Sequence, residues 1–141
     1  MVKTQKTSVK ALKVEDVMTE MVFAVTPVMT LREVVSLFLE KKISGAPIID
    51  QNGKVISVIS QSDLIQLIAL EGMAKTVNFY LPKLPRTEDV ISVRRTDLFR
   101  DVFKQFLVKP VRRIIVTDGN GSLQGLVSKS NLLKAFLEAE G

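Results

Sequence analysis

The sequence predicts a mixed α+β fold in which two copies of one β-α-β-β-α motif pack as a pseudo-twofold pair. When the chain is shifted by 68 residues, residues 25–65 align with residues 93–133 without a gap, and 12 of the 41 pairs are identical. The matched positions include an Asp-x-Asn-Gly sequence at 50–53 and again at 118–121. Chance similarity does not keep one register through strands, turns and helices together, so the chain is a tandem duplication.

Each copy is predicted to contain the same elements. The first helix carries one apolar stripe, formed by Leu31, Val34, Val35, Phe38 and Leu39 in the first copy and by Phe99, Val102, Phe103, Phe106 and Leu107 in the second. The predicted strands are 23–25, 47–49 and 55–59, then 91–93, 114–116 and 123–127, and the closing helices begin at about Ser62 and Ser130. The Asn-Gly pairs predict tight hairpin turns with positive φ angles. Because one thin sheet and two helices cannot bury both sheet faces, the copies are expected to pack together.

The repeat also predicts the domain organisation. Residues 1–13 form a basic N-terminal tail, residues 14–76 the first motif and residues 77–141 the second, and the two motifs make one module. The linking stretch 71–87 contains one glycine and two prolines. We therefore expect the preceding helix to end near Leu70 and the rest of the link to be irregular.

The composition excludes several kinds of chemistry. Apolar residues make up 46% of the chain and charged residues 25%, which is the balance of a globular domain with a core. The absence of Cys and His removes thiol nucleophiles, disulfides, thiolate zinc sites and the Ser-His-Asp triad. With no nucleophile–base pair and no metal-ligating cluster, the protein is expected to be no enzyme and to require no metal or cofactor. No stretch has the pattern of a secretory signal or the length of a membrane span, so a cytoplasmic protein with no membrane partner is expected.

The net charge of +5 is unevenly distributed along the chain. Four lysines precede the first acidic residue, Glu15, as is typical of a solvated terminal segment. Residues 14–65 carry a net charge of −3, whereas the equivalent residues 82–133 carry +5. The excess of positive charge either pairs with the acidic first copy or serves an anionic ligand.

Three stretches stand in order in the first copy, and together with the duplication they carry a family resemblance. They are Asp-Val-Met-Thr at 16–19, Ile-Ser-Gly-Ala-Pro-Ile-Ile-Asp at 43–50 and Val-Ile-Ser-Gln-Ser-Asp-Leu at 58–64. This set resembles the CBS domain family over about residues 14–137. The resemblance implies a tandem CBS pair, or Bateman module, that stands alone as a regulatory sensor. It also implies two clefts between the copies, where adenosine-containing ligands often bind.

The sequence Ser-Gln-Ser-Asp at 60–63 follows a strand and starts a helix. Unpaired N–H groups at a helix start favour anions, and the Ser60 hydroxyl could donate to a phosphate. Asp63, one turn later, could accept hydrogen bonds from both ribose hydroxyls. The same spacing is that of a capping box, and a cap at Ser62 with Ser60 facing a ligand would satisfy both interpretations. The resemblance favours the ligand, with Ser60 at the phosphate and Asp63 at the ribose.

The second copy departs from this pattern. Its sequence is Ser128-Lys129-Ser130-Asn131, and Asn131 can still bond a ribose hydroxyl, although without the strength of a carboxylate. Arg112 and Arg113 precede its middle strand at positions that line the cleft in the family. Together with Lys129, they are candidates for a di- or triphosphate. The resemblance further assigns the adenine to backbone groups at Gly45, Ala46 and Ile114. Val25 and Thr26, which precede the first long helix, could form a wall for the base.

The expected ligand is thus an adenine nucleotide, with AMP, ADP or ATP preferred. The closing helix of the first copy, residues 64–70, is apolar almost all round, and such helices form dimer contacts in the family, so a homodimer is expected. An effector protein would receive the signal. Two alternatives remain. One is a nucleic-acid-binding module that uses the lysine tail and the pairs Arg94-Arg95 and Arg112-Arg113, and the other is a protein-interaction module with vestigial clefts.

Overall fold

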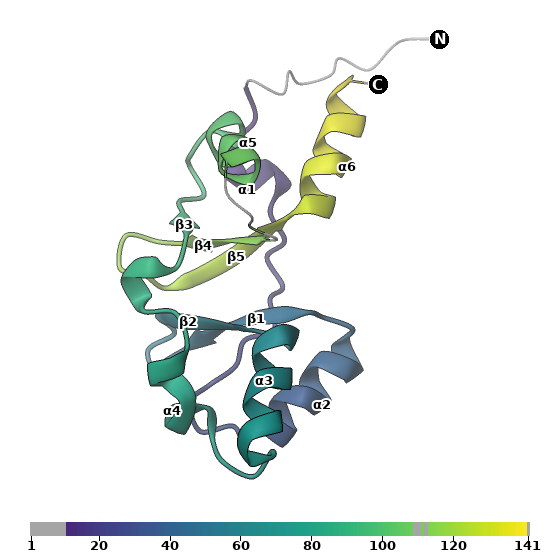
Figure 1. Ribbon diagram of the computed structural model, residues 1–141. Coiled ribbons are helices and arrows are strands. Elements are labelled where there is room, and N and C mark those ends of the chain that lie inside the picture. Colours follow the sequence, from purple (N-terminus) through teal and green to yellow (C-terminus); the bar gives the residue numbers. More distant parts are fainter. Residues whose placement is uncertain (1–10, 109–110, 112, 141) are drawn as a thin grey trace. The chain divides into compact units, whose positions relative to one another are not determined.

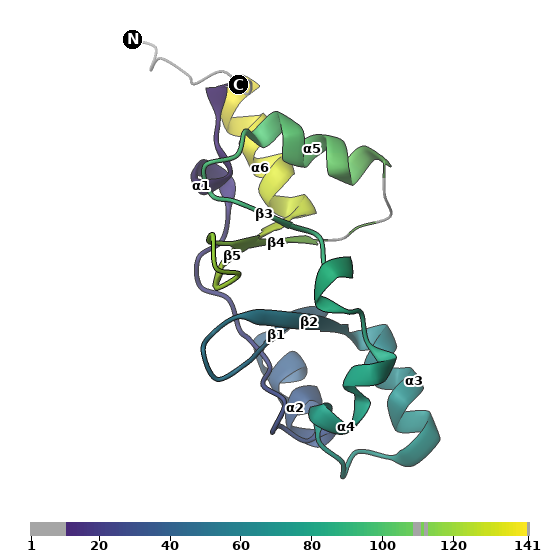
Figure 2. The ribbon, with the colours of Figure 1, turned by 90° about the vertical axis from the view of Figure 1, so that its left-hand side faces the viewer.

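The computed structural model describes residues 11–108, 111 and 113–140, and it divides the chain into two compact units (Figures 1 and 2). We call Val22–Val90 with Asn120–Leu123 the first-copy unit. The second-copy unit comprises Met1–Met21, Ile91–Gly119 and Gln124–Gly141. The compact units and the sequence repeats therefore divide the chain in different ways.

In the first-copy unit, a small sheet carries helices on one face (Figures 1 and 2). Its strands β1 (Gly45–Ile49) and β2 (Val55–Ser60) are antiparallel. Val25 adds a short parallel bridge to Ile48, with its N–H 2.9 Å from the Pro47 carbonyl oxygen. The helices are α2 (Leu31–Lys41) and α3 (Gln61–Glu71). This arrangement confirms the predicted mixed α+β motif.

Helix α2 has both a defined start and a buried stripe. Thr30 and Glu33 form a capping box, in which the Glu33 N–H donates to Thr30 Oγ1 at 3.1 Å. The helix ends where Lys42 takes a left-handed conformation, with φ of 56°. The core of the unit includes three members of the predicted stripe and residues from both strands, α3 and the linker: Val25, Leu31, Val34, Phe38, Ala46, Ile48, Ile59, Leu64, Leu67, Val77, Tyr80 and Leu84.

The second-copy unit repeats the arrangement with three strands in the order β3-β4-β5. The strands are β3 (Ser92–Val93), β4 (Arg113–Thr117) and β5 (Leu123–Ser128). The first residue of β5, Leu123, belongs to the first-copy unit. The helices are α1 (Val14–Val17), α5 (Phe99–Val108) and α6 (Lys129–Glu140). Its core contains three mutually packed rings, Phe99, Phe103 and Phe136, with ring centroids 5.0 to 6.4 Å apart.

The hairpin turns differ from the expectation. Gly53 and Gly121 have φ of 80° and 83°, but neither Asn52 nor Asn120 has a positive φ. In the first turn, the Asp50 carboxylate oxygen Oδ1 accepts hydrogen bonds from the N–H groups of Asn52 and Lys54, at 2.8 and 3.0 Å. The aspartate side chain thus organises this turn, and the left-handed conformation is needed only at the glycine.

The linker between the copies is more ordered than the sequence predicts. It contains α4 (Val77–Tyr80) and two short 3₁₀ helices, η2 (Leu81–Lys83) and η3 (Thr87–Asp89). Lys75 Nζ lies 2.8 Å from Glu71 Oε2 and 4.0 Å from the ring centroid of Phe79. The hydrogen bond from Lys75 lowers the pKa of Glu71, and burial of the ring raises the pKa of Tyr80. These contacts hold the linker against the end of α3.

The segment before each copy packs onto a strand of the other copy. We call residues 11–21 and 84–90 the leading segments. Thr19 pairs with Leu126 of β5 through two backbone hydrogen bonds of 2.8 and 2.9 Å. A Cβ atom at Gly125 would lie 2.7 Å from the Thr19 carbonyl oxygen, so only glycine permits this approach. At the equivalent position of the first copy, the Ser57 hydroxyl donates to the Pro85 carbonyl oxygen at 2.7 Å.

Candidate functional site

In the first-copy unit, the end of β2 and the start of α3 bring Ser60 and Asp63 together. The Asp63 N–H donates to Ser60 Oγ at 3.1 Å. In return, the N–H and the hydroxyl of Ser60 both donate to Asp63 Oδ2, at 2.8 and 2.9 Å. This is a complete capping box, which satisfies the first turn of the helix.

The structure confirms the capping-box interpretation of residues 60–63 and contradicts the alternative in which Ser62 caps the helix and Ser60 is free to face a ligand. Ser60 is the N-cap residue, and its hydroxyl proton points to Asp63. The N–H of Gln61 is also engaged, because it donates to the Ser44 carbonyl oxygen at 2.9 Å. A phosphate at this helix start would therefore require the Ser60 hydroxyl to rotate away from Asp63.

Asp63 nevertheless retains capacity for a ligand. Both hydrogen bonds from Ser60 end on Oδ2. A carboxylate offers about four lone-pair positions, so Oδ1 can accept further donors such as ribose hydroxyls. Asp63 as a whole is half-buried.

The other predicted residues of this unit lie at different places. Gly45 pairs directly with Ser60 across the two strands, so its backbone belongs to the site. Ala46 is buried in the core, so only its backbone could reach a ligand. Thr26 follows Val25, and Val25 pairs with Ile48 of β1. Ile48 is three residues along β1 from Gly45, a separation of about 10 Å. The structure does not bring Thr26 to Ser60 and Asp63 within this unit.

The second-copy unit builds the same box with an amide in place of the carboxylate. Asn131 Oδ1 accepts from the N–H and the hydroxyl of Ser128, at 2.9 and 3.1 Å, and the Asn131 N–H donates to Ser128 Oγ at 3.2 Å. The Asn131 side chain also has donors, and its Nδ2 donates to Thr19 Oγ1 at 3.2 Å. Asparagine thus caps the helix and binds the leading segment with one side chain.

Sequence reasoning did not assign Thr19 to this site. The available signal was the Asp-Val-Met-Thr stretch, which carries the family resemblance. Thr19 lies beside Asn131, 112 positions away in the sequence, because the leading segment packs on β5. No periodicity in the sequence predicts that contact.

The basic candidates of the second-copy unit differ in position. Lys129 is the exposed first residue of α6, and Arg113 is the half-buried first residue of β4. The Ile114 side chain is fully buried, so only its backbone is available. Arg112 lies outside the described residues.

Arg95 bears on the nucleic-acid alternative. Its guanidinium lies 3.2 Å from a carboxylate oxygen of Glu15 and 3.2 Å from one of Glu20. These two acidic neighbours offset its charge, which weakens the case for Arg95 as a phosphate contact.

Among the residues that the structure describes, no three His, Cys, Asp or Glu side chains are grouped so that they could hold a metal ion. None of the helices in this part of the chain is long and apolar enough to cross a bilayer.

Comparison with known proteins identifies relatives of this chain. The model of the CBS domain family matches residues 14–70 and 84–138. The uncharacterized protein MJ1232 of Methanocaldococcus jannaschii is 33% identical over 127 residues, which cover 90% of this chain and 40% of that protein. The chloroplastic CBS domain-containing protein CBSX1 of Arabidopsis thaliana is 26% identical, over 81% of this chain and 58% of that protein. This chain therefore spans less than two thirds of either relative.

A solved structure is also similar in fold. The crystal structure of CBSX2 from Arabidopsis thaliana in complex with AMP has a TM-score of 0.78 and 26% sequence identity to this chain. The similarity covers 92% of this chain and 98% of that one. The similarity therefore covers both copies and not only a single family motif.

The capping geometry predicts which serine stabilises α3. Replacing Ser60 with Ala should lower the free energy of unfolding by about 1 kcal/mol, because it removes the N-cap acceptor. Replacing Ser62 with Ala is the matched control and should change it by less than about 0.5 kcal/mol. Urea unfolding followed by circular dichroism measures both. A larger loss for Ser62→Ala would contradict the assignment of the cap.

Proposed function

Since the chain belongs to the CBS domain family and contains a tandem pair of these domains, we propose that it senses an adenosine-containing nucleotide. The ligand contacts in this proposal are the starts of α3 and α6, with Ser60 and Asp63 in one unit and Ser128 and Asn131 in the other. The protein performs no chemistry on the ligand. It passes its bound state to an effector protein.

One observation carries the proposal. A hydroxyl and a carboxylate or amide stand at the same register in both copies, each pair at the junction of a strand and a helix. The Asp63 oxygen Oδ1 is suited to the paired hydroxyls of a ribose. CBSX2, at 26% identity, was crystallised with AMP, which supports the ligand class.

The two copies suit different ligands in this proposal. Asp63 offers charge-assisted hydrogen bonds to ribose hydroxyls, which favours adenosine or a monophosphate at the first copy. Asn131 lacks the charge, but Arg113 and Lys129 lie in the same unit. Together with Arg112, these basic residues favour a di- or triphosphate at the second copy.

The signal arises from differential binding. A ligand that bonds Asp63 or Asn131 competes with the hydrogen bonds of the capping box, so it binds a state with an open box more tightly than the closed box seen in the structure. A ligand at 100 times its dissociation constant stabilises the bound state by about 2.7 kcal/mol. That is sufficient to change which surface is presented to an effector.

The Asp63→Asn variant tests the nucleotide site. Asn131 forms the same box in the second copy, so the variant should keep the cap and the fold while losing the carboxylate. AMP affinity at the first copy should fall by about tenfold or more, as for loss of a hydrogen bond to a charged group. Isothermal titration with AMP, ADP, ATP, NAD and S-adenosylmethionine measures it.

Asp101→Asn, an exposed change on α5, is the matched control for that titration and should leave nucleotide affinity unaltered. The proposal fails if none of the five ligands binds the wild-type protein. If a ligand binds but Asp63→Asn does not weaken it, the assignment of Asp63 fails.

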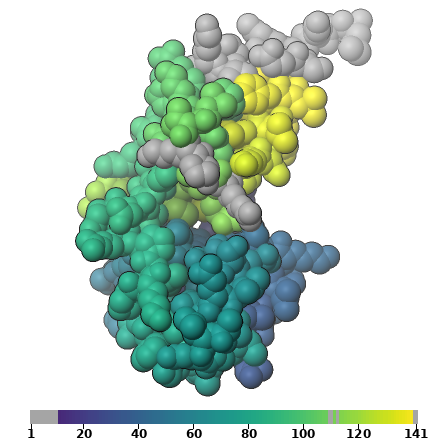
Figure 3. All heavy atoms as spheres, viewed as in Figure 1, coloured from purple at the N-terminus to yellow at the C-terminus, as the bar shows by residue number. Residues whose placement is uncertain are grey.

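We also infer that the protein forms a homodimer through the outer faces of α3 and α6. Ile65 and Leu133 occupy the same position in the two copies and are 69% and 71% exposed, and Leu137 adds to the second face. Figure 3 shows the outer surfaces of α3, in teal, and α6, in yellow. Because the duplication presents two matching apolar faces, a second copy of the chain is the partner that suits both.

Sedimentation equilibrium tests the dimer. The wild-type chain should sediment with twice the monomer mass, and the double variant Ile65→Glu, Leu133→Glu should sediment as a folded monomer because each glutamate would be buried in the interface. Leu107→Glu, on α5, is the control, because Leu107 is equally exposed but lies on another helix. A monomeric wild-type protein would contradict the inference.

A further inference from the structure

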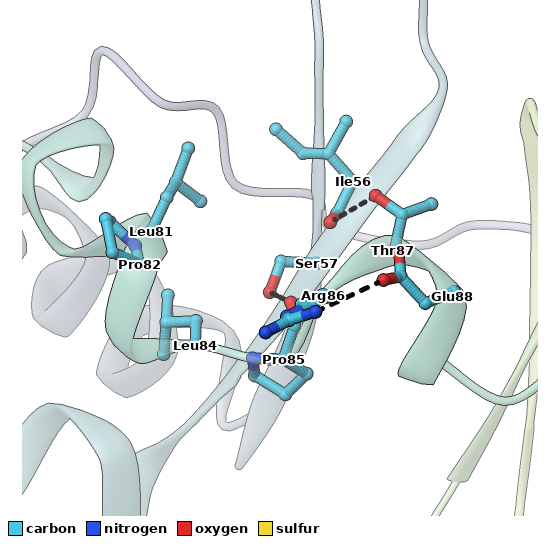
Figure 4. A pocket seen from close by; sticks show the side chains of 9 residues that line it. All are labelled: Ile56, Ser57, Leu81, Pro82, Leu84, Pro85, Arg86, Thr87 and Glu88. Carbon is cyan, nitrogen blue, oxygen red and sulfur yellow. Dashed lines mark hydrogen bonds and ion pairs between the residues drawn. The ribbon is translucent and has the colours of Figure 1, made fainter.

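A pocket of about 520 Å³ opens in the first-copy unit, away from the start of α3 (Figure 4). It lies between strand β2 and the linker and is lined by Ile56, Ser57, Leu81, Pro82, Leu84, Pro85, Arg86, Thr87 and Glu88. Its volume is within the range of about 300 to 1,000 Å³ that is typical of small-molecule sites. Ser57 is three residues along β2 from Ser60, a separation of about 10 Å.

Comparison of the two copies explains why this pocket exists. By the shift of 68 residues, Arg86 corresponds to Met18 and Ser57 to Gly125. In the second-copy unit, Met18 packs against Gly125, with its sulfur 3.2 Å from the position that a Cβ atom would take. In the first-copy unit, the side chain of Arg86 is 80% exposed and leaves the equivalent space open. The first copy has therefore exchanged an apolar plug for a cation at the rim.

The lining defines the chemistry of a ligand. Five of the nine residues are apolar, and they are seen as sticks around the opening in Figure 4: Ile56, Leu81, Pro82, Leu84 and Pro85. The hydroxyls of Ser57 and Thr87 already donate to backbone carbonyl oxygens, at 2.7 and 2.9 Å. The wall is thus apolar with its own polar groups satisfied, which suits an apolar body.

Arg86 supplies the charge. Its Nη1 lies 3.8 Å from Glu88 Oε1, and both side chains are largely exposed. An exposed ion pair at that distance contributes little to stability. A carboxylate or phosphate in the pocket could therefore replace Glu88 as the partner of the guanidinium, with the two short, parallel hydrogen bonds that guanidinium groups form.

We propose that this pocket is a further binding site, separate from the nucleotide sites, for a small organic anion with an apolar, ring-sized body. The apolar wall takes the body and Arg86 takes the anionic group. The site uses none of the residues assigned to the nucleotide, so it stands independently of the nucleotide proposal.

Methyl NMR of the full chain, labelled at Ile and Leu and titrated with 2-naphthoate, tests the site. The methyl resonances of Ile56, Leu81 and Leu84 should shift and saturate together. The neutral analogue 2-naphthalenemethanol should bind about tenfold more weakly, because it lacks the charge that Arg86 recognises. The Arg86→Met variant should weaken 2-naphthoate by at least the same factor, because it removes the cation and restores the plug of the second copy.

Lys83→Met is the matched control, since Lys83 is an exposed cation on the same linker that does not line the pocket, and it should leave the affinity unchanged. The proposal is overturned if the shifts fall on other methyl groups, such as those of Leu133 and Leu137. It is also overturned if Arg86→Met and Lys83→Met weaken 2-naphthoate equally, which would indicate general attraction to a basic protein, or if binding does not saturate.

Discussion

The structure depends on an exchange of leading segments, in which the chain before each copy completes the compact unit of the other. Val14, at the start of the chain, is fully buried in the core that contains Phe99 and Val127. Leu84, just before the second copy, is buried in the core that contains Phe38 and Ile59. Neither copy therefore contains all the apolar residues that bury its sheet and helices, and each compact unit requires the leading segment that precedes the other copy.

The same exchange shapes the candidate sites. The Asn131 side chain caps α6 and at the same time donates to Thr19, which the leading segment holds on β5. Any ligand donor or acceptor that engages Asn131 therefore acts on a segment far away in sequence. In the other leading segment, Thr87 stands at the position equivalent to Thr19. Its hydroxyl donates to the Ile56 carbonyl oxygen, so Thr87 makes no matching contact with Asp63. The two helix starts are consequently related by the duplication but differ in their contacts with the leading segments.

Much of the fold follows from the sequence, because the duplication and the apolar periodicity are both readable in it. Of the predicted stripe, Leu31, Val34 and Phe38 are buried, whereas Leu39 is 69% exposed, and the closing helices begin one residue before Ser62 and Ser130. The spacing of Ser60 and Asp63 predicted the capping box that the structure contains, but the sequence left a cap at Ser62 open. The structure pairs Ser60 with Gly45 at the end of β2 and begins α3 at Gln61.

Other features depend on tertiary contacts that no local pattern encodes. Short helices in the linker form because Val77 and Tyr80 are buried in the first core, although the prolines predict an irregular segment. The pocket beside Arg86 results from a difference between the copies at two positions that touch only in the folded chain. The sequence shows that Arg86 stands at the position equivalent to Met18. It does not show that Met18 packs against Gly125.

The exchange of leading segments is tested most directly by unfolding two fragments of nearly equal length. The fragment 22–90 contains nearly all of the first-copy unit, whereas the fragment 14–76 follows the sequence motif and lacks the buried residues Val77, Tyr80 and Leu84. Urea unfolding followed by circular dichroism should show a cooperative transition for 22–90 and none for 14–76. Equal cooperativity of the two fragments, or a transition only for 14–76, would contradict the account.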